Sequence, residues 1–98
     1  MKLIVEKDIE QRLRRRVEQR GGLCLKLTAK DGIPDRLVVL PDRAPVFVEL
    51  KRPVGGRLAP IQEYEIKRLR SIGQRVFVIK NFEEIEAFLA KFDEGNTM

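Results

Sequence analysis

The 98-residue sequence predicts one α/β domain in which a small mixed sheet is flanked by helices. Three observations support this class. Apolar residues recur with helical spacing near both ends of the chain, short stretches with strand character lie between them, and another helical stretch separates the last two strands. The predicted order is therefore αβββαβα, with a single domain over residues 1–92 and a polar tail over 93–98.

The first predicted helix covers residues 5–20 and is followed by a glycine pair that ends it. A strand is predicted over 23–28, where leucines alternate with other residues, and a loop over 29–34. Strands over 36–40 and 46–51 follow, and the proline-containing segment between them favours a hairpin. The apolar positions of the helix are Val5, Ile9, Leu13 and Val17, and the glycine pair is Gly21-Gly22.

The second half of the chain predicts a helix, a strand and a last helix. The helix over 60–72 begins at Pro60, since proline is favoured at a first helical position. The strand over 74–80 is apolar on both faces and is predicted to be central in the sheet. The last helix follows Asn81, with Glu84 as its capping-box partner. The apolar faces are expected to consist of Ile61, Leu69 and Ile72 in the second helix, and of Phe82, Ile85, Phe88 or Leu89, and Phe92 in the last.

The composition excludes most of the usual enzyme chemistries. The sequence has no histidine, so it has no imidazole base, no Ser-His or Cys-His nucleophile pair and no Cys/His zinc site. The lone Cys24 excludes a disulfide framework and is compatible with a reducing interior. No apolar stretch approaches a membrane span, so we expect a soluble, intracellular protein. Catalysis would have to rest on carboxylates, lysines and a hard metal ion.

The charge is distributed unevenly along the chain. Residues 1–80 carry a net charge of +9, and residues 81–98 carry −4, which gives +5 overall. A basic surface attracts a polyanion such as nucleic acid by neutralising its phosphates. The alternative is that these arginines and lysines are ordinary solvated surface residues. If the first interpretation holds, we expect the acidic last helix and tail to face away from the polyanion.

Two carboxylates are predicted to meet where the second and third strands lie side by side. Asp35 opens the second strand and Glu49 lies late in the third, and these positions are adjacent in an antiparallel pair. Neighbouring carboxylates repel unless a cation separates them, and Mg²⁺ commonly binds one or two carboxylates with water and phosphate oxygens. Strand alternation places Lys51 on the face of Glu49. The alternatives are that Asp35 only forms a turn after Pro34 and that the strand shows its polar groups to water.

Two more polar side chains are candidates for this site. On a helical wheel Glu6 lies inside the apolar arc of the first helix, where a carboxylate needs a partner. The alternative is that Glu6 only stabilises the amino terminus of the helix. Gln62, near the start of the second helix, either reaches the same strand or is a solvated amide.

Taken together, these residues resemble the signature of the PD-(D/E)xK nuclease superfamily and, within it, the virus-type replication-repair nuclease (VRR-NUC) domain. The resemblance spans about residues 5–92 and includes Glu6 and the glycine pair before the first strand. One position departs from it, because Glu65 stands where an apolar or aromatic residue is expected. The matching segments are Gly32-Ile33-Pro34-Asp35-Arg36-Leu37-Val38-Val39-Leu40, Val48-Glu49-Leu50-Lys51-Arg52-Pro53 and Leu58-Ala59-Pro60-Ile61-Gln62.

The resemblance implies a restriction-endonuclease-like core and the hydrolysis of DNA phosphodiester bonds with Mg²⁺ or Mn²⁺. Lys51 would orient the attacking water and stabilise developing negative charge, and Gln62 would help to position that water or Lys51. The implied metal ligands are Asp35, Glu49 and the backbone carbonyl of Leu50, with Glu6 supporting the metal directly or through water.

The resemblance also implies a substrate and an assembly. Small members of the family resemble phage-encoded enzymes, and the fold is similar to that of Holliday-junction resolvases, which act as homodimers. We therefore expect branched DNA such as a four-way junction as the substrate, a homodimer, and a location in the cytoplasm of a bacterial or phage-infected cell. A short chain also gains stability by burying surface in an oligomer. The candidate DNA contacts are Arg14, Arg15, Arg16, Arg36, Arg52 and Arg57.

Three alternatives to this function stay open. The chain could be a non-catalytic nucleic-acid-binding module, although such a module has no need of carboxylates where phosphate must approach. It could be a subunit of a replication, repair or restriction assembly that is inactive alone. It could also be a sequence-specific endonuclease that cuts unbranched DNA.

Overall fold

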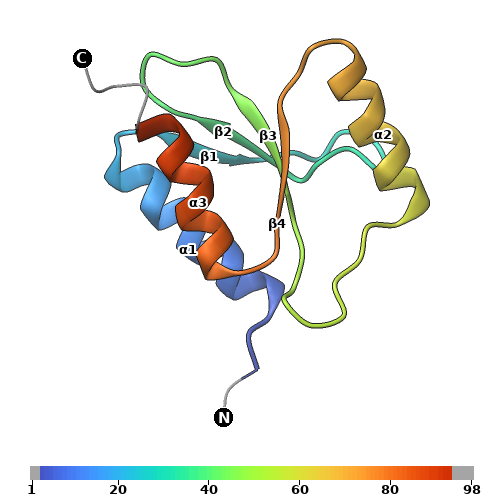
Figure 1. The fold of residues 1–98 in the computed structure, drawn as a ribbon, viewed down its shortest axis with the longest axis horizontal. Coiled ribbons are helices and arrows are strands. Elements are labelled where there is room, and N and C mark those ends of the chain that lie inside the picture. Colours follow the sequence, from blue (N-terminus) through green and yellow to red (C-terminus); the bar gives the residue numbers. More distant parts are fainter. Residues whose placement is uncertain (1–2, 94–98) are drawn as a thin grey trace.

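The computed structural model describes residues 3–93 and confirms the predicted order of elements (Figure 1). Most elements are shorter than predicted by one or a few residues. The predicted tail lies outside the described residues from position 94 onward, and Asp93 ends the last helix. The elements are α1 (Glu6–Gln19), β1 (Leu23–Lys26), β2 (Arg36–Val39), β3 (Val46–Leu50), α2 (Pro60–Ser71), β4 (Val76–Ile79) and α3 (Phe82–Asp93).

The four strands form one mixed sheet in the order β1-β2-β3-β4. The pairs β1/β2 and β2/β3 are antiparallel, and β3/β4 is parallel. A parallel pair needs a crossover connection, which α2 provides. The register aligns Arg36 with Val48, so that Asp35, just before β2, comes beside Glu49 on β3.

Helices cover the two faces of the sheet. In Figure 1, α1 and α3 lie side by side, whereas α2 lies apart from them and next to β4. One apolar core joins α1 and α3 to one face of the sheet, and its burial is the main stabilising contribution to the fold. The core comprises Ile9, Leu13 and Val17 of α1, Val38, Leu40, Val46, Val48, Leu50 and Ile79 from the sheet region, and Ile85, Phe88, Leu89 and Phe92 of α3.

The prediction that the fourth strand is central is wrong, because β4 lies at an edge of the described sheet. The strand is nevertheless apolar on both faces, since α3 packs on one face and α2 on the other. Phe77 makes an edge-to-face contact with Phe88 of α3, with ring centroids 4.9 Å apart. Val76 points to the opposite face of the sheet from Phe77 and is also buried.

Two predicted apolar faces are also partly wrong. Ile61 of α2 and Ile72, the C-cap residue of this helix, are exposed, and the buried residues of α2 are Glu65 and Ile66. Because α2 contacts mainly the edge strand β4, only a narrow side of it is covered. Val5 is 43% exposed, since it precedes the first residue of α1 as its N-cap and does not join the core.

The start of α3 is as predicted, with one difference in the cap. Asn81 Oδ1 accepts a hydrogen bond from the Glu84 N–H at 2.8 Å. The Glu84 carboxylate accepts from the Lys80 N–H at 2.7 Å, one residue before the predicted partner. Among residues 3–93, no helix has the length and apolar character needed to cross a membrane.

Candidate active site

Two carboxylates lie side by side where β2 begins and β3 ends. Glu49 is only 2% exposed, and the side chain of Asp35 is partly buried. The Leu50 N–H donates to Asp35 Oδ1 at 3.3 Å, and the backbone N–H of Asp35 donates to the Glu49 carboxylate. The antiparallel pairing of β2 and β3 therefore brings these two residues together, as the sequence predicts.

Both carboxylates have pKa values above the ordinary ones. Burial raises the pKa of Glu49, and the charge of Asp35 raises it further, against the lowering effect of Lys51. Burial also raises the pKa of Asp35, against the charge of Arg36, and Glu6 adds to the rise. The negative charges are therefore only partly compensated within the protein, and a bound cation would relieve their repulsion.

Lys51 and Gln62 both contact the same oxygen of Glu49. Lys51 Nζ lies 3.4 Å from Glu49 Oε2, and Gln62 Nε2 donates to that oxygen at 2.9 Å. The other end of the Gln62 amide, Oε1, accepts from the Ala59 N–H at 2.8 Å. A backbone N–H can only donate, so the amide oxygen must face Ala59 and the NH₂ group must face Glu49. Gln62 thus reaches the strand and is not a solvated amide.

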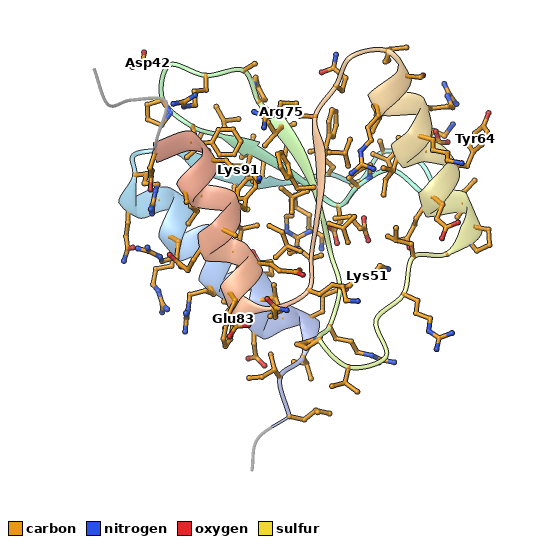
Figure 2. The ribbon with its side chains drawn as sticks, in the orientation of Figure 1. Asp42, Lys51, Tyr64, Arg75, Glu83 and Lys91 are labelled. Atoms are coloured by element: carbon orange, nitrogen blue, oxygen red, sulfur yellow. The ribbon has the colours of Figure 1, made fainter. Side chains whose placement is uncertain are left out.

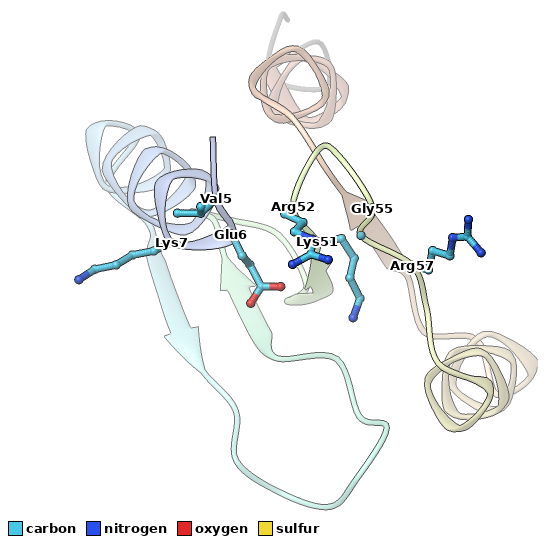
Figure 3. A pocket seen from close by; sticks show the side chains of 8 residues that line it. Val5, Glu6, Lys7, Lys51, Arg52, Gly55 and Arg57 are labelled. Atoms are coloured by element: carbon cyan, nitrogen blue, oxygen red, sulfur yellow. The ribbon is translucent and has the colours of Figure 1, made fainter. Parts of the chain in front are cut away.

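A cavity of about 560 Å³ opens beside Lys51, between the start of α1 and the loop after β3. Lys51 itself lies between the α1–α3 pair and α2 (Figure 2). In Figure 3 the side chains of Glu6, Lys51 and Arg52 converge, whereas Lys7 and Arg57 extend outward. Lys7, which stands next to Glu6 in the first turn of α1, was not predicted from the sequence.

The loop after β3 folds back on itself at Gly56. A Cβ atom at this position would lie 2.3 Å from the backbone oxygen of Arg52 and 3.1 Å from the Cβ of Lys51. Only glycine permits that approach without a shift of the backbone. This turn therefore fixes the shape of the cavity wall next to Lys51.

Glu6 is exposed at the cavity wall and does not face the apolar core. Among the described residues, no three acidic or cysteine side chains gather closely enough to hold a metal ion together. A divalent ion bound here would therefore need Asp35 and Glu49 together with backbone or water oxygens. Oxygen donors of this kind fit the hard cations Mg²⁺ and Mn²⁺.

Comparisons with known proteins show which family the chain is similar to. No family model matches the sequence. A protein of Acyrthosiphon pisum secondary endosymbiont phage 1, named "Putative nuclease p44", is 41% identical over 81 residues, which cover 81% of this chain and 86% of that protein. A solved structure described as "VRR_NUC domain" is similar with a TM-score of 0.81 and 33% identity, over 87% of this chain and 94% of that one. The chain belongs to the VRR-NUC family. The resemblance seen in the sequence and the α/β fold it implies are therefore confirmed.

On the α1 side of this VRR-NUC domain, a small charged cluster surrounds Arg36. Its guanidinium donates to the Asp35 backbone oxygen at 2.8 Å and lies 4.0 Å from Glu10 Oε2. Glu10 also pairs with Arg14 at 3.1 Å. Glu10 was not predicted from the sequence, although it lies one helical turn after Glu6 and so on the same side of α1.

The six arginines predicted to contact DNA lie in different parts of the VRR-NUC domain. Arg52 and Arg57 line the cavity, whereas Arg15 is exposed on α1. Arg16 is not at the site, because its Nε and Nη2 donate to the Glu86 carboxylate of α3 at 2.9 and 2.8 Å. A hydrogen-bonded ion pair of this kind holds Arg16 against α3.

The single cysteine of the domain has no features of a nucleophile. Cys24 is half-buried on β1 and forms no disulfide. Burial raises the pKa of its thiol to about 11, so the thiol stays protonated at neutral pH.

Proposed function

We propose that this VRR-NUC domain is a metal-dependent endonuclease that hydrolyses phosphodiester bonds in DNA. The proposal rests on one observation, the adjacent carboxylates of Asp35 and Glu49 with the ammonium of Lys51 at 3.4 Å from Glu49. Its family membership and its similarity to a phage nuclease support the same class of reaction. No histidine is present, so carboxylates, a lysine and a metal ion would have to supply the chemistry.

In this proposal Asp35, Glu49 and the Leu50 backbone carbonyl hold Mg²⁺ or Mn²⁺, with Glu6 acting through water. The raised pKa values of the two carboxylates support a cation between them, because a bound cation would favour their charged forms. When bound, the ion would polarise a phosphoryl oxygen and lower the pKa of a coordinated water.

Lys51 would stabilise the negative charge that develops on the phosphoryl oxygens and orient the attacking water. Its ammonium is held near Glu49 before substrate arrives, so little reorganisation is needed during the reaction. Gln62 would keep Glu49 and the water in position, since its amide is fixed at both ends by Ala59 and Glu49. Gln62 lies on a helix and Glu49 on a strand, so rigid elements carry both groups of this hydrogen bond.

The DNA backbone would approach the cavity between α1 and the loop after β3. Arg52, Arg57 and Lys7 line this opening, and the net charge of +9 over residues 1–80 supports attraction of phosphates. Arg14, Arg15 and Arg36 would extend the contacts along α1 and β2, whereas the ion pair of Arg16 with Glu86 argues against its use. Phosphate contacts of this kind position the duplex without reading its sequence.

We also propose branched DNA, such as a four-way junction, as the substrate, and a homodimer as the acting form in the cytoplasm of a bacterial or phage-infected cell. Two copies related by a two-fold axis carry two sites that could cut opposite strands of a junction. Sedimentation of the purified protein tests the dimer. A monomer that still cuts the two strands symmetrically would contradict the two-fold arrangement.

Cleavage of four-way, flap, single-stranded and linear duplex DNA with Mg²⁺ or Mn²⁺ tests the activity. We expect cutting of branched DNA, and a loss of at least about a hundredfold in Glu49→Ala and Lys51→Ala with DNA binding largely retained. Glu18→Ala, which removes an exposed carboxylate of α1, is the matched control and should cut normally. Equal cleavage by Glu49→Ala would refute the site assignment.

The same assay separates the alternative functions. Absence of cleavage with either metal would contradict the proposal and favour a subunit that is inactive alone. DNA binding without any cleavage or metal dependence would favour a binding module. Discrete bands from unbranched plasmid would favour a sequence-specific endonuclease.

A further inference from the structure

Glu65 is a buried charge that the proposed reaction does not use. Glu49 and Glu65 are the two charged side chains found buried among the described residues, each 2% exposed. A carboxylate removed from water is unfavourable unless charged or hydrogen-bonding partners surround it. Its position on α2 is also the one at which an apolar or aromatic residue is expected from the family resemblance. The contacts of Glu65 therefore indicate what this charge contributes.

The two oxygens of Glu65 face two different cations. Oε2 lies 2.8 Å from Lys30 Nζ, and Oε1 lies 3.3 Å from Arg68 Nη1. Arg68 belongs to α2 itself, three residues away, so that contact is local. Lys30 belongs to the connection between β1 and β2, residues 27–35. The Glu65–Lys30 ion pair therefore ties this connection to α2.

A second contact joins the same connection to the same helix. Gly32 has a φ of +88°, and a Cβ atom there would lie 2.7 Å from Ile61 Cγ1 and 3.0 Å from Glu65 Cγ. The backbone of the connection therefore lies directly on the first turns of α2. The Ile33 N–H donates to the Lys30 oxygen at 3.3 Å and closes the turn between the two contacts.

The connection leads directly into Asp35, and α2 also reaches Glu49. Gln62, one turn before Glu65, donates to Glu49 Oε2 at 2.9 Å. We propose that Glu65 is a positioning residue that, through Lys30, holds the 27–35 connection on α2 and thereby fixes Asp35 relative to Glu49. The helix α2 then positions both carboxylates, Asp35 through the Glu65–Lys30 ion pair and Glu49 through Gln62. The role of Glu65 in catalysis rests on the proposed function of Asp35 and Glu49.

Hydrogen exchange of the metal-free full chain tests the positioning without any DNA or metal. The Leu27 N–H donates to the Asp35 backbone oxygen at 2.9 Å, and the Leu50 N–H donates to Asp35 Oδ1 at 3.3 Å, so both amides report on the seating of Asp35. We expect Glu65→Gln and Lys30→Met to speed exchange at both amides by about tenfold, with core amides of α1 and α3 unchanged.

Two results would overturn the proposal in this experiment. One is an unchanged rate at the Leu50 amide in both variants, and the other is an equal acceleration at all amides, which indicates general destabilisation. The Lys30 side chain is 59% exposed, so Lys30→Met keeps the test valid if Glu65→Gln folds poorly. The double variant should behave like the single ones, because both substitutions break the same ion pair.

Cleavage at increasing Mg²⁺ or Mn²⁺ tests the consequence for the site. We expect Glu65→Gln and Lys30→Met to need about tenfold more metal for half-maximal rate, while the rate at saturating metal falls less than about threefold. Glu83→Gln, which neutralises an exposed carboxylate of α3, should match the wild type in both quantities. A lower saturating rate with an unchanged metal requirement would overturn the positioning role. If the wild-type protein cuts no DNA, the proposed function fails, and hydrogen exchange still decides whether Glu65 seats Asp35.

Discussion

The carboxylates of the candidate site and those between α1 and α3 have opposite electrostatic surroundings. Burial raises the pKa of Asp35 and of Glu49, and the charge of Asp35 raises the pKa of Glu49 further. Between the helices, a hydrogen bond from Arg16 of α1 lowers the pKa of Glu86, and one from Arg20, the C-cap residue of α1, lowers the pKa of Asp93. The same residue types are thus unfavourably placed in one region and favourably placed in the other.

This difference separates charges that are paired within the fold from charges to which the proposed function assigns a role in the reaction. The pairs between α1 and α3 lie near the surface, where each ion pair contributes little and needs no further partner. Where β2 begins and β3 ends, strand pairing and α2 hold two carboxylates together in spite of their repulsion. Repulsion between carboxylates that the protein does not compensate is characteristic of functional sites, because a bound ligand can relieve it. Two substitutions, followed in three measurements, test the comparison.

The largest effect is expected for Asp35→Asn on cleavage. The amide keeps an oxygen for the Leu50 N–H but loses the negative charge that would hold a metal ion. We expect the cleavage rate to fall by at least about a hundredfold with DNA binding retained, measured on branched DNA at saturating Mg²⁺. Retention of activity within about tenfold would show that Asp35 is not a ligand.

A moderate increase in thermal stability is expected for Asp35→Asn without metal, in contrast to its loss of activity. A carboxylate whose pKa is raised on folding destabilises the folded protein at pH values above that raised pKa. At pH values below its ordinary pKa of about 4, it has no effect on stability. In chelator at pH 7, the melting temperature should therefore rise by about 2–5 °C, and the gain should vanish towards pH 4. A variant that melts below the wild type at pH 7 would contradict the comparison.

The smallest effect is expected for Glu86→Gln. A carboxylate whose pKa is lowered on folding stabilises the protein above its ordinary pKa, and this contribution is lost as pH falls through the lowered value. The melting temperature at pH 7 should therefore fall by about 1–2 °C, since water partly screens the pair at the surface, and the difference should vanish at low pH. Cleavage should stay within about twofold of the wild type, and a clear loss would place Glu86 in the reaction after all.

Much of the fold was predictable because its signals are local. Helical spacing, the glycine pair and the Asn81 cap indicated the helices, and the hairpin placed Asp35 beside Glu49. The position of β4 was not predictable from its composition, because helices on both faces make an edge strand as apolar as a central one. The buried side of α2 was mispredicted for a related reason, since this helix covers only the edge strand and the connection before β2 and therefore buries a narrow stripe.

The parts of the site that the sequence did not predict depend on contacts between distant segments. The ion pair of Lys30 with Glu65 joins a loop to a helix, and periodicity carries no information about which loop lies on which helix. Likewise, Glu10 belongs to the charged cluster because Arg36 approaches it, and Lys7 belongs to the cavity wall because the loop after β3 folds opposite it. These side chains are assigned only once the elements are assembled.

The loop after β3 also has a bearing on how this domain could change its substrate range. It joins Lys51, at the end of the strand, to α2, which carries Gln62, and its residues form one wall of the cavity. Lengthening a surface loop costs little entropy, about 0.6 kcal/mol for each doubling of its length. In the proposed function, insertions and deletions between Pro53 and Gly55 would therefore widen or narrow the entrance for different DNA shapes, while the two ends of the loop keep Lys51 and Gln62 in place.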